Sequence, residues 1–216
     1  MLEIDIINHL RKDNIPVPEY IKTRNNEYYF EYEGRVVIIQ KYIDGFTMKS
    51  NSGSYDQMIE SADFLGKIVL SLKSFPELPS NDLIECTSKS SILESIDKIN
   101  KLKNSVSKDS KIYNDLNDKV MMLQDILSNV DLKDIDKLTV MNSHGDYSVL
   151  QFIYKDDRIN AIIDFASASR VPIVWEIIRS YSYIDKDAED GKINIDNLVE
   201  YVRTFEKYVK LNINNI

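Results

Sequence analysis

Apolar residues recur every three or four positions in several stretches of the chain, which is the spacing of a helix that buries one face. The first such stretch contains Leu2, Ile6, Ile7 and Leu10. By this pattern we expect helices over residues 2–12, 55–74, 91–104, 109–129 and 195–211. A further helical segment is expected after Val171-Pro172, with Trp175, Ile178 and Tyr181 on one of its faces.

Two other stretches have the pattern of β-hairpins. Residues 27–32 are rich in aromatic side chains, residues 35–42 are apolar and β-branched, and Glu33-Gly34 between them is typical of a turn. Between Leu150 and Phe165, an apolar run, a polar turn and a second apolar run follow one another. Each stretch therefore predicts two antiparallel strands joined by a tight turn.

A hairpin region followed by a mainly helical region with one inserted hairpin indicates an α+β fold. Short additional strands are expected at residues 19–23 and 138–141. Asp44-Gly45 interrupts the strand pattern, so we expect one region over residues 1–43 and a second over residues 44–216.

Composition and charge narrow the class of protein. The chain has 216 residues, of which 43% are hydrophobic and 29% charged, as in a soluble globular protein. Its formal net charge of −8 argues against a general nucleic-acid binder, because such proteins gather Lys and Arg for the phosphate backbone. An acidic surface suits a cationic small molecule, and it also serves solubility alone.

The single cysteine, Cys86, cannot form an intramolecular disulfide, which favours a reducing, cytoplasmic setting. Charged residues within Met1–Asp5 do not fit a signal peptide, and no apolar run approaches the ~20 residues that span a bilayer. We therefore expect a cytoplasmic protein without a membrane segment.

Two carboxylates bracket the second hairpin. Asp146 follows His144-Gly145 just before it, and Asp164 follows Ile162-Ile163 at its far end. Transfer of a phosphoryl group needs a carboxylate that accepts the proton of the attacking hydroxyl and oxygen ligands for Mg²⁺. Gln151 can add a neutral amide oxygen, and on a strand it would share a face with Ile153.

Blander interpretations remain open for each motif alone. His-Gly-Asp is often only a turn, and an Asp after two isoleucines can simply end a strand. The combination, with strand–turn–strand between the two carboxylates, is more specific. A histidine-based metal hydrolase is disfavoured because His9 and His144 are the two histidines of the chain.

These motifs together resemble the aminoglycoside phosphotransferase/choline kinase family, whose members are related to the protein kinases. The catalytic-loop pattern H-G-D-x-x-x-x-N matches His144, Gly145 and Asp146, with Gln151 at the Asn position. The metal-binding I-D-F pattern matches Ile163-Asp164-Phe165, and a downstream P-x-x-W-E-I element matches Pro172, Trp175, Glu176 and Ile177. An N-terminal E-x-x-I-I-x-x-L helix, followed by prolines, matches Glu3, Ile6, Ile7, Leu10, Pro16 and Pro18. The resemblance runs from residue 3 to about residue 205.

The resemblance implies a role for each of these positions. Asp146 would be the catalytic base, Asp164 the principal Mg²⁺ ligand and Gln151 the second ligand, with His144 as a brace of the loop. Glu3 would pair with the lysine that grips the nucleotide phosphates, and a hinge would bind the nucleobase of ATP or GTP. The hinge residues would be Gln40, Lys41, Tyr42 and Ile43, and the residues that support the floor of the site would be Trp175, Glu176 and Arg179. The expected substrate is a small-molecule hydroxyl compound of the aminoglycoside, choline or homoserine type.

The chain departs from the family pattern at two points. Gln151 is one methylene longer than the family's Asn. The strands that precede the Glu3 helix in the family, with a Gly-rich loop and the phosphate-gripping lysine, have no counterpart, so we expect a shortened N-terminal lobe with an exposed strand edge that can associate. A non-catalytic, kinase-like binding or regulatory module is therefore the alternative to an active phosphotransferase.

Overall fold

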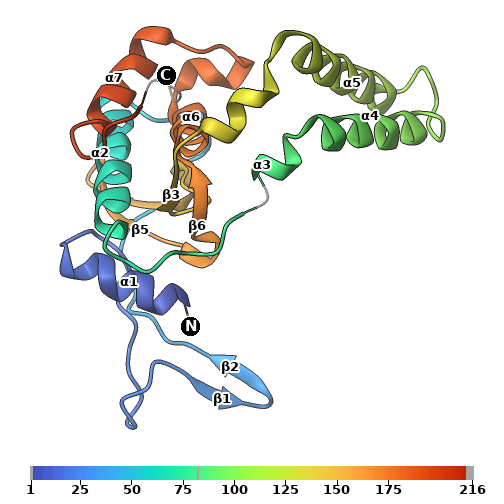
Figure 1. Ribbon diagram of the computed structural model, residues 1–216. Helices are drawn as coiled ribbons and strands as arrows, with labels where there is room; N and C mark the ends of the chain where they lie inside the picture. Colours follow the sequence, from blue (N-terminus) through green and yellow to red (C-terminus); the bar gives the residue numbers. More distant parts are fainter. Residues whose placement is uncertain (1, 82, 213–216) are drawn as a thin grey trace. The chain divides into compact units, whose positions relative to one another are not determined.

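The computed structural model describes residues 2–81 and 83–212 of the chain. They divide into two compact units, one formed by Met1–Ser80 with Thr139–Ile216 and the other by Asn81–Leu138 (Figure 1). All of the residues predicted to carry chemistry belong to the first unit. The division at residues 43 and 44 stays a prediction.

The first unit alternates helices with short strands, as an α+β fold does. Its helices are α1 (Leu2–Lys12), α2 (Tyr55–Leu72), α6 (Ile173–Ile184) and α7 (Ile195–Phe205). Its strands are β1 (Phe30–Tyr32), β2 (Arg35–Val37), β3 (Val140–Ser143), β4 (Phe152–Lys155), β5 (Arg158–Ile162) and β6 (Ser169–Pro172). Single 3-10 turns lie at η2 (Val149–Gln151), η3 (Phe165–Ser167) and η4 (Lys186–Asp190).

The second unit is a helical hairpin with short flanking turns. It contains α3 (Leu83–Cys86), α4 (Lys89–Lys103), α5 (Lys111–Asn129) and the 3-10 turn η1 (Leu132–Lys137). Serine side chains cap the N-termini of the two long helices, from Ser88 for α4 and Ser110 for α5.

Both predicted hairpins are confirmed, and each closes through a two-residue turn. Glu33 and Gly34 between β1 and β2, and Asp156 and Asp157 between β4 and β5, all have positive φ. Two-residue turns with positive φ at both positions follow the natural twist of antiparallel strands, and Gly, Asp and Asn tolerate them best. The third sheet joins β3 to β6 in antiparallel fashion, so that the ends of the intervening segment, residues 144–168, lie close together.

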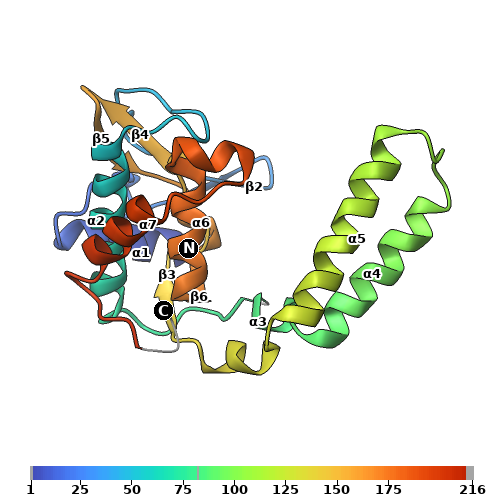
Figure 2. The same ribbon diagram turned by 90° about the horizontal axis from the view of Figure 1, so that it is seen from above.

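Helix α2 is the centre of the first unit. It packs against α1, α6 and α7, and it also contacts β3 and β5 (Figures 1 and 2). Its N-terminus carries a capping box, in which the Ser54 side chain accepts the backbone N–H of Gln57 and the Gln57 side chain accepts that of Ser54. The fully buried large side chains around it include Met58, Leu65, Tyr147, Phe152, Tyr181, Tyr201 and Phe205.

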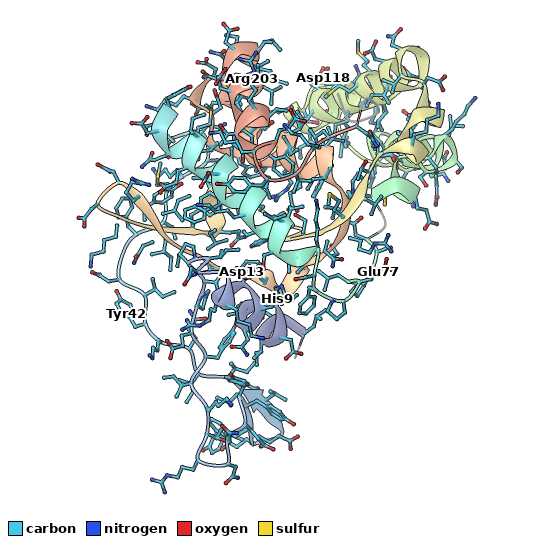
Figure 3. The ribbon with its side chains drawn as sticks, turned by 60° about the vertical axis from the view of Figure 1, so that its left-hand side comes forward. His9, Asp13, Tyr42, Glu77, Asp118 and Arg203 are labelled. Carbon is cyan, nitrogen blue, oxygen red and sulfur yellow. The ribbon has the colours of Figure 1, made fainter. Side chains whose placement is uncertain are left out.

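Helix α1 is fastened to the C-terminal end of α2 by polar contacts. The His9 ring donates through Nε2 to the carbonyl oxygen of Ser71 at 3.0 Å, and the Ser71 hydroxyl donates to Asp13 at 2.5 Å. Figure 3 labels His9 on α1 and Asp13, which directly follows the helix. This end of α1 is therefore fixed, and Glu3 lies in its first turn, at the other end.

Helix positions agree closely with the apolar pattern, and the differences are local. Residues 83–86 form the short helix α3, which lies outside the predicted helices. The strand predicted at residues 19–23 is a single bridge between Tyr20 and Gln40, and β3 begins at Val140, two residues after the predicted start. None of the helices among the described residues is long and apolar enough to cross a bilayer.

The buried face of α6 differs from the face marked by the largest apolar side chains. Trp175 and Ile178 are only partly buried, whereas Glu176 and Ser180 are completely enclosed. Tyr181 is buried as well. The rotation of the helix follows from the role of Glu176, which receives hydrogen bonds from the neighbouring loop.

Candidate active site

The candidate catalytic loop, residues 144–148, follows β3 and begins with a sharp turn. Gly145 has φ +79°, and a side chain at this position would overlap the carbonyl group of Ser167. Glycine alone combines this backbone conformation with so close an approach of another chain segment. The turn brings Asp146 out of the strand, with its side chain one third exposed.

Glu176 fixes the candidate catalytic loop through hydrogen bonds with its backbone. Its carboxylate accepts the backbone N–H of Gly145 at 3.1 Å and that of Tyr147 at 2.9 Å, and its side chain is fully buried. A carboxylate that accepts two backbone N–H groups forms strong, charge-assisted hydrogen bonds in such an environment. The N–H groups on both sides of Asp146 are therefore tied to the first turn of α6.

His144 joins the catalytic loop to the segment that carries the second carboxylate. Its Nδ1 accepts the backbone N–H of Asp146 at 3.3 Å, and its Nε2 donates to the carbonyl of Ile163 at 3.0 Å. The ring is fully buried and lies 4.4 Å from the ring of Phe165, centre to centre. Burial lowers the pKa of His144, against the opposing effect of the Glu176 charge, so the ring is neutral. The ring thus contacts both segments, and its role as a brace stays a prediction.

Both oxygens of the Asp146 carboxylate have partners. Oδ1 forms an ion pair with Arg179 on α6, and Oδ2 accepts the side-chain N–H of Gln151 at 2.9 Å. Arg179 also donates to the carbonyl oxygen of Tyr147 at 3.2 Å. Two groups from opposite sides therefore fix the orientation of the carboxylate.

Gln151 does not lie on a strand as expected. It ends the 3-10 turn η2, and β4 begins at the next residue, because the N–H of Gln151 bonds back to the carbonyl of Ser148. Its amide nitrogen faces Asp146, and its backbone carbonyl accepts the N–H of Ile163 at 2.9 Å. The residue thus stands between the two carboxylate-bearing segments, and its side-chain oxygen is directed away from Asp146.

Asp164 lies just beyond the end of β5 rather than on the strand face with Ile162. Its backbone is left-handed, with φ +65° and ψ +61°, and its side chain is exposed. The neighbouring residues are tied down on both sides, since Ile163 bonds to His144 and Gln151 while Phe165 is buried. The left-handed turn therefore exposes the Asp164 carboxylate to solvent, while the residues on either side of Asp164 hold its backbone in place.

The donor set fits a magnesium ion of the kind that a nucleotide brings to a protein. Mg²⁺ takes hard oxygen ligands and commonly uses one or two carboxylates, with the remaining positions filled by phosphate and water. Asp164 offers an accessible carboxylate, and Gln151 has an amide oxygen not engaged by Asp146. Among the described residues there is no group of three or more His, Cys, Asp or Glu side chains arranged to hold a metal by themselves.

The charges of Glu3 and Asp164 both act on the phenol of Tyr20. Burial, the charge of Glu3 and a hydrogen bond with Glu3, followed by the charge of Asp164, raise the pKa of Tyr20 to about 12. Tyr20 is therefore close to both carboxylates, although they are 161 residues apart in sequence (164 − 3). The sequence did not single out Tyr20, because its contacts depend on the bridge between residues 20 and 40.

The predicted hinge, residues 40–43, runs along the surface. Lys41 is held at its start, where its N–H bonds to the carbonyl of Glu19 at 2.8 Å and its ammonium pairs with the Glu19 carboxylate at 2.7 Å. Tyr42 is 86% exposed and points away from the core (Figure 3). The side chain of Gln40 is exposed and that of Ile43 is half-buried, so this segment runs along the surface with its backbone accessible.

The strand that leads to the hinge has one open edge. Val37 pairs with Phe30, and the backbones of Ile39 and Lys41 bond to residues 21 and 19, so by alternation residues 36, 38 and 40 turn their backbone groups the other way. No described residue bonds to that edge, and Val36 and Ile38 are exposed beside it. The exposed edge agrees with expectation, and association through it stays a prediction.

Trp175 and Arg179, which were predicted to support the floor of the site, lie in contact on α6. The Arg179 guanidinium lies 5.6 Å from the centre of the Trp175 ring and 4.8 Å from that of Tyr183, one turn of helix to either side. Both contacts are within the range of cation–π attraction. The sequence analysis named Trp175 and Arg179. Tyr183 could also have been suggested, because it lies four residues after Arg179 on the same helix.

The chain has the fold of the aminoglycoside phosphotransferases and related small-molecule kinases. An aminoglycoside phosphotransferase from Alicyclobacillus acidocaldarius superposes on 99% of this chain and 66% of its own, with a TM-score of 0.70 and 12% identity. A spectinomycin phosphotransferase bound to ADP and spectinomycin gives a TM-score of 0.67 at 12% identity, over 98% of this chain and 64% of its own. An amicoumacin kinase bound to AMP-PNP, Ca²⁺ and its substrate gives 0.62 at 11% identity, over 97% and 62%.

These structures are similar to the chain in fold, at 11–12% sequence identity. The chain spans about two thirds of the length of each of them. No protein-family model matches the sequence, and comparison with curated proteins yields no significant match.

Proposed function

We propose that this chain is a member of the aminoglycoside phosphotransferase-like kinases and transfers the γ-phosphoryl group of ATP or GTP to a hydroxyl of a small molecule. Asp146 is the base, and Asp164 and Gln151 are the ligands of Mg²⁺. The aminoglycoside, choline and homoserine types of acceptor all present such a hydroxyl. The fold supports this class of reaction, since two of the matched structures carry a nucleotide or an analogue of one.

The observation that carries the proposal is the physical connection between the two carboxylate-bearing segments. His144 bonds to both the loop of Asp146 and the carbonyl of Ile163, and Gln151 bonds to Asp146 and to Ile163. A base and a metal ligand that act on one phosphoryl group must keep a fixed separation. Two independent bridges between their segments provide it.

We assign the following roles to the residues of the site. Asp146 receives the hydroxyl of the acceptor, orients it and takes its proton as the new bond to phosphorus forms. Glu176 and His144 keep the loop rigid, and Arg179 and Gln151 prevent the carboxylate from rotating. When bound, Mg²⁺ neutralises charge on the phosphates.

The nucleotide would approach along the segment from residue 36 to residue 45. The hinge backbone at residues 40–43 would hydrogen-bond the base, and Glu3 would face the phosphate end, since it shares Tyr20 as a neighbour with Asp164. The division between an N-terminal region, residues 1–43, and a C-terminal region, residues 44–216, then coincides with the hinge. Cytoplasmic location is part of the same proposal.

The decisive experiment measures nucleotide binding and phosphoryl transfer separately. Titration with Mg²⁺ and ATP gives the affinity, and ADP release with kanamycin, choline and homoserine as acceptors gives the rate. Asp146→Asn should lower the rate ~10²–10⁴-fold, the usual contribution of a positioned general base, and should leave nucleotide affinity within about twofold.

Asp156→Asn is the matched control, because Asp156 has the same side chain, lies in the β4–β5 turn and has a positive φ that asparagine accepts. It should change neither quantity. Absence of Mg·ATP binding at millimolar concentration would overturn the proposal and favour a non-catalytic binding module. Full turnover by Asp146→Asn would refute the assignment of the base.

A further inference from the structure

Tyr147, the residue directly after the predicted base, is anchored by two helices. From α6, Glu176 accepts its backbone N–H at 2.9 Å and Arg179 donates to its backbone carbonyl oxygen at 3.2 Å. From α2, the carbonyl oxygen of Ser61 accepts a hydrogen bond from the Tyr147 phenol at 2.9 Å. The Tyr147 side chain is completely buried, so its phenol contacts the protein core and not the space that a substrate could occupy.

The contact of Tyr147 with α2 continues into a network of buried hydroxyl groups, formed by Ser61, Tyr201 and Ser180. The Ser61 hydroxyl lies 3.1 Å from the Tyr201 hydroxyl of α7, which in turn lies 2.7 Å from the Ser180 hydroxyl of α6. Ser180 also donates to the carbonyl oxygen of Ile177 at 3.0 Å. The residues of this hydroxyl network are all fully buried.

The donors of the hydroxyl network are used in a defined order. A hydroxyl has one hydrogen to donate, and Ser180 uses its own on Ile177. Tyr201 therefore donates to Ser180, and Ser61 donates to Tyr201. Burial raises the pKa of Tyr201 to about 12 and that of Tyr147 well above its ordinary value, so both phenols keep their hydrogens at neutral pH. Each of these hydroxyls is a paired donor, and a fully satisfied polar network is rigid in the core.

The hydroxyl network leads back to the candidate catalytic loop. It ends at Ile177, and the preceding residue of α6, Glu176, accepts the N–H of Tyr147. Helices α2, α6 and α7 also pack against one another (Figures 1 and 2). A loop bound to α6 alone could pivot about that helix, and the phenol of Tyr147 prevents this because it fixes the loop to α2 as well.

We infer that Tyr147 is a positioning residue for the predicted base, and that its phenol, supported by the hydroxyl network, keeps the Asp146 carboxylate in place relative to Asp164. The inference rests on the proposed function, in which Asp146 is the base. A misplacement of about 1 Å can lower a reaction rate ~10²-fold. Because the phenol itself does not reach the substrate space, its loss should act on the rate and not on the affinity for substrates.

The first test is Tyr147→Phe, which removes the hydroxyl and keeps the ring. Hydrogen–deuterium exchange should become ~2–10-fold faster in peptides that cover residues 144–151, the factor that corresponds to the loss of one neutral hydrogen bond. Turnover is measured with Mg²⁺, ATP and the acceptor among kanamycin, choline and homoserine that the chain phosphorylates. We expect kcat to fall about tenfold, as for a slightly displaced base, and KM for both substrates to stay within about twofold.

Tyr154→Phe is the matched control. Tyr154 is equally buried and lies on β4, but its hydroxyl has no hydrogen-bond partner among the described residues. The substitution deletes the same group from a core tyrosine without breaking a hydrogen bond, so it should change neither loop exchange nor kcat. Urea unfolding of both variants defines conditions in which each is folded, and a purely structural role of Tyr147 would lower stability there without a change in kcat.

Tyr201→Phe tests the hydroxyl network one step further from the loop. It breaks the contacts with Ser61 and Ser180 and leaves the phenol of Tyr147 bound to α2. Loop exchange should become faster and kcat lower than in the unaltered chain, each by a smaller factor than for Tyr147→Phe. This variant also provides the measurement if Tyr147→Phe does not fold, and unchanged values would then count against the inference.

The outcomes separate this inference from the proposed function. Unchanged loop exchange and kcat in Tyr147→Phe, equal changes in Tyr154→Phe, or a rise in KM without a fall in kcat would overturn the positioning role while the proposed reaction could stand. Absence of turnover by the unaltered chain would count against the proposed function. Loop exchange would still decide whether the phenol of Tyr147 holds the loop.

Discussion

His144 shows how one buried side chain can fix the conformation of a loop through the hydrogen bonds of its ring. Both of its ring nitrogens are occupied, one as an acceptor for Asp146 and the other as a donor to Ile163. A protonated ring could no longer accept the N–H of Asp146, because both nitrogens would then be donors. The loop therefore depends on a neutral histidine, and burial provides it.

This dependence predicts how stability changes with pH. An unfolded histidine has a pKa of about 6.5, and the pKa of folded His144 is lower, so between the two values the unfolded chain binds the extra proton. Stability should consequently fall as pH drops below about 6.5 and rise toward pH 7.5, by at most about 1.4 kcal/mol per pH unit. Urea unfolding at pH 5.5, 6.5 and 7.5 measures the effect.

The comparison needs variants of both histidines. His144→Gln should flatten the pH dependence over this range. His9→Gln serves as the control for the loss of a histidine, because His9 is partly exposed on α1 and lies outside the loop. Equal slopes for the unaltered chain and His144→Gln would contradict the prediction.

At the scale of elements, the connection between α6 and the catalytic loop is the most consequential. Glu176 accepts two backbone N–H groups inside the protein, and its removal would leave both without partners. A hydrogen bond to a charged group contributes about 1.5–3 kcal/mol, and unpaired buried donors cost additional free energy. Glu176→Ala should therefore lower the free energy of unfolding by about 3 kcal/mol or more.

Chemical denaturation of the variant and of Glu200→Ala tests this prediction. Glu200 is an exposed glutamate on α7 that pairs with Arg203, so its loss should cost about 0.5 kcal/mol or less. Glu176→Gln should fall between the two, because the amide oxygen still accepts one N–H. A loss for Glu176→Ala no larger than that for Glu200→Ala would show that the loop does not depend on this contact.

The sequence predicted the elements well where one simple period governs them. Helix α2 and the β4–β5 hairpin each bury one face or close through a tight turn, and both properties are local. The buried face of α6 was not predictable in the same way. By hydrophobicity alone, Trp175 rather than Glu176 would be buried. Glu176 is buried instead because its carboxylate accepts two backbone N–H groups of a loop that is distant in sequence.

In the candidate site, too, features that depend on neighbouring residues were predictable, and features that depend on contacts between distant segments were not. The two carboxylates were apparent from their spacing around a hairpin, since a hairpin returns the chain to its starting point. Gln151 departed from expectation because a 3-10 turn delays the start of β4, and Tyr20 was missed because its neighbours, Glu3 and Asp164, come from opposite ends of the chain. Contacts between distant segments leave no periodic signal in the sequence.

At the scale of the whole molecule, the two units differ in how much they bury. Helix α2 in the first unit has ten buried residues, whereas Val120 is the one buried residue of α5 in the described chain. Helix α4 similarly buries Ile92. Full burial of one aliphatic side chain contributes about 1.5–3 kcal/mol, so the pair α4 and α5 has far less to offset the entropy of ordering two long helices.

The second unit should therefore open without unfolding of the first. Amide hydrogens in the middle of α4 and α5 should exchange at least tenfold faster than those in the middle of α2, because a difference of about 1.4 kcal/mol in opening free energy produces that factor. Hydrogen–deuterium exchange with peptide resolution measures both. Helices α2 and α5 contain 18 and 19 residues, so fraying at their ends is comparable and the contrast reflects burial. Equal protection in α2 and α5 would mean that the second unit is stabilised by contacts other than its own core, because the helices themselves cannot supply that protection.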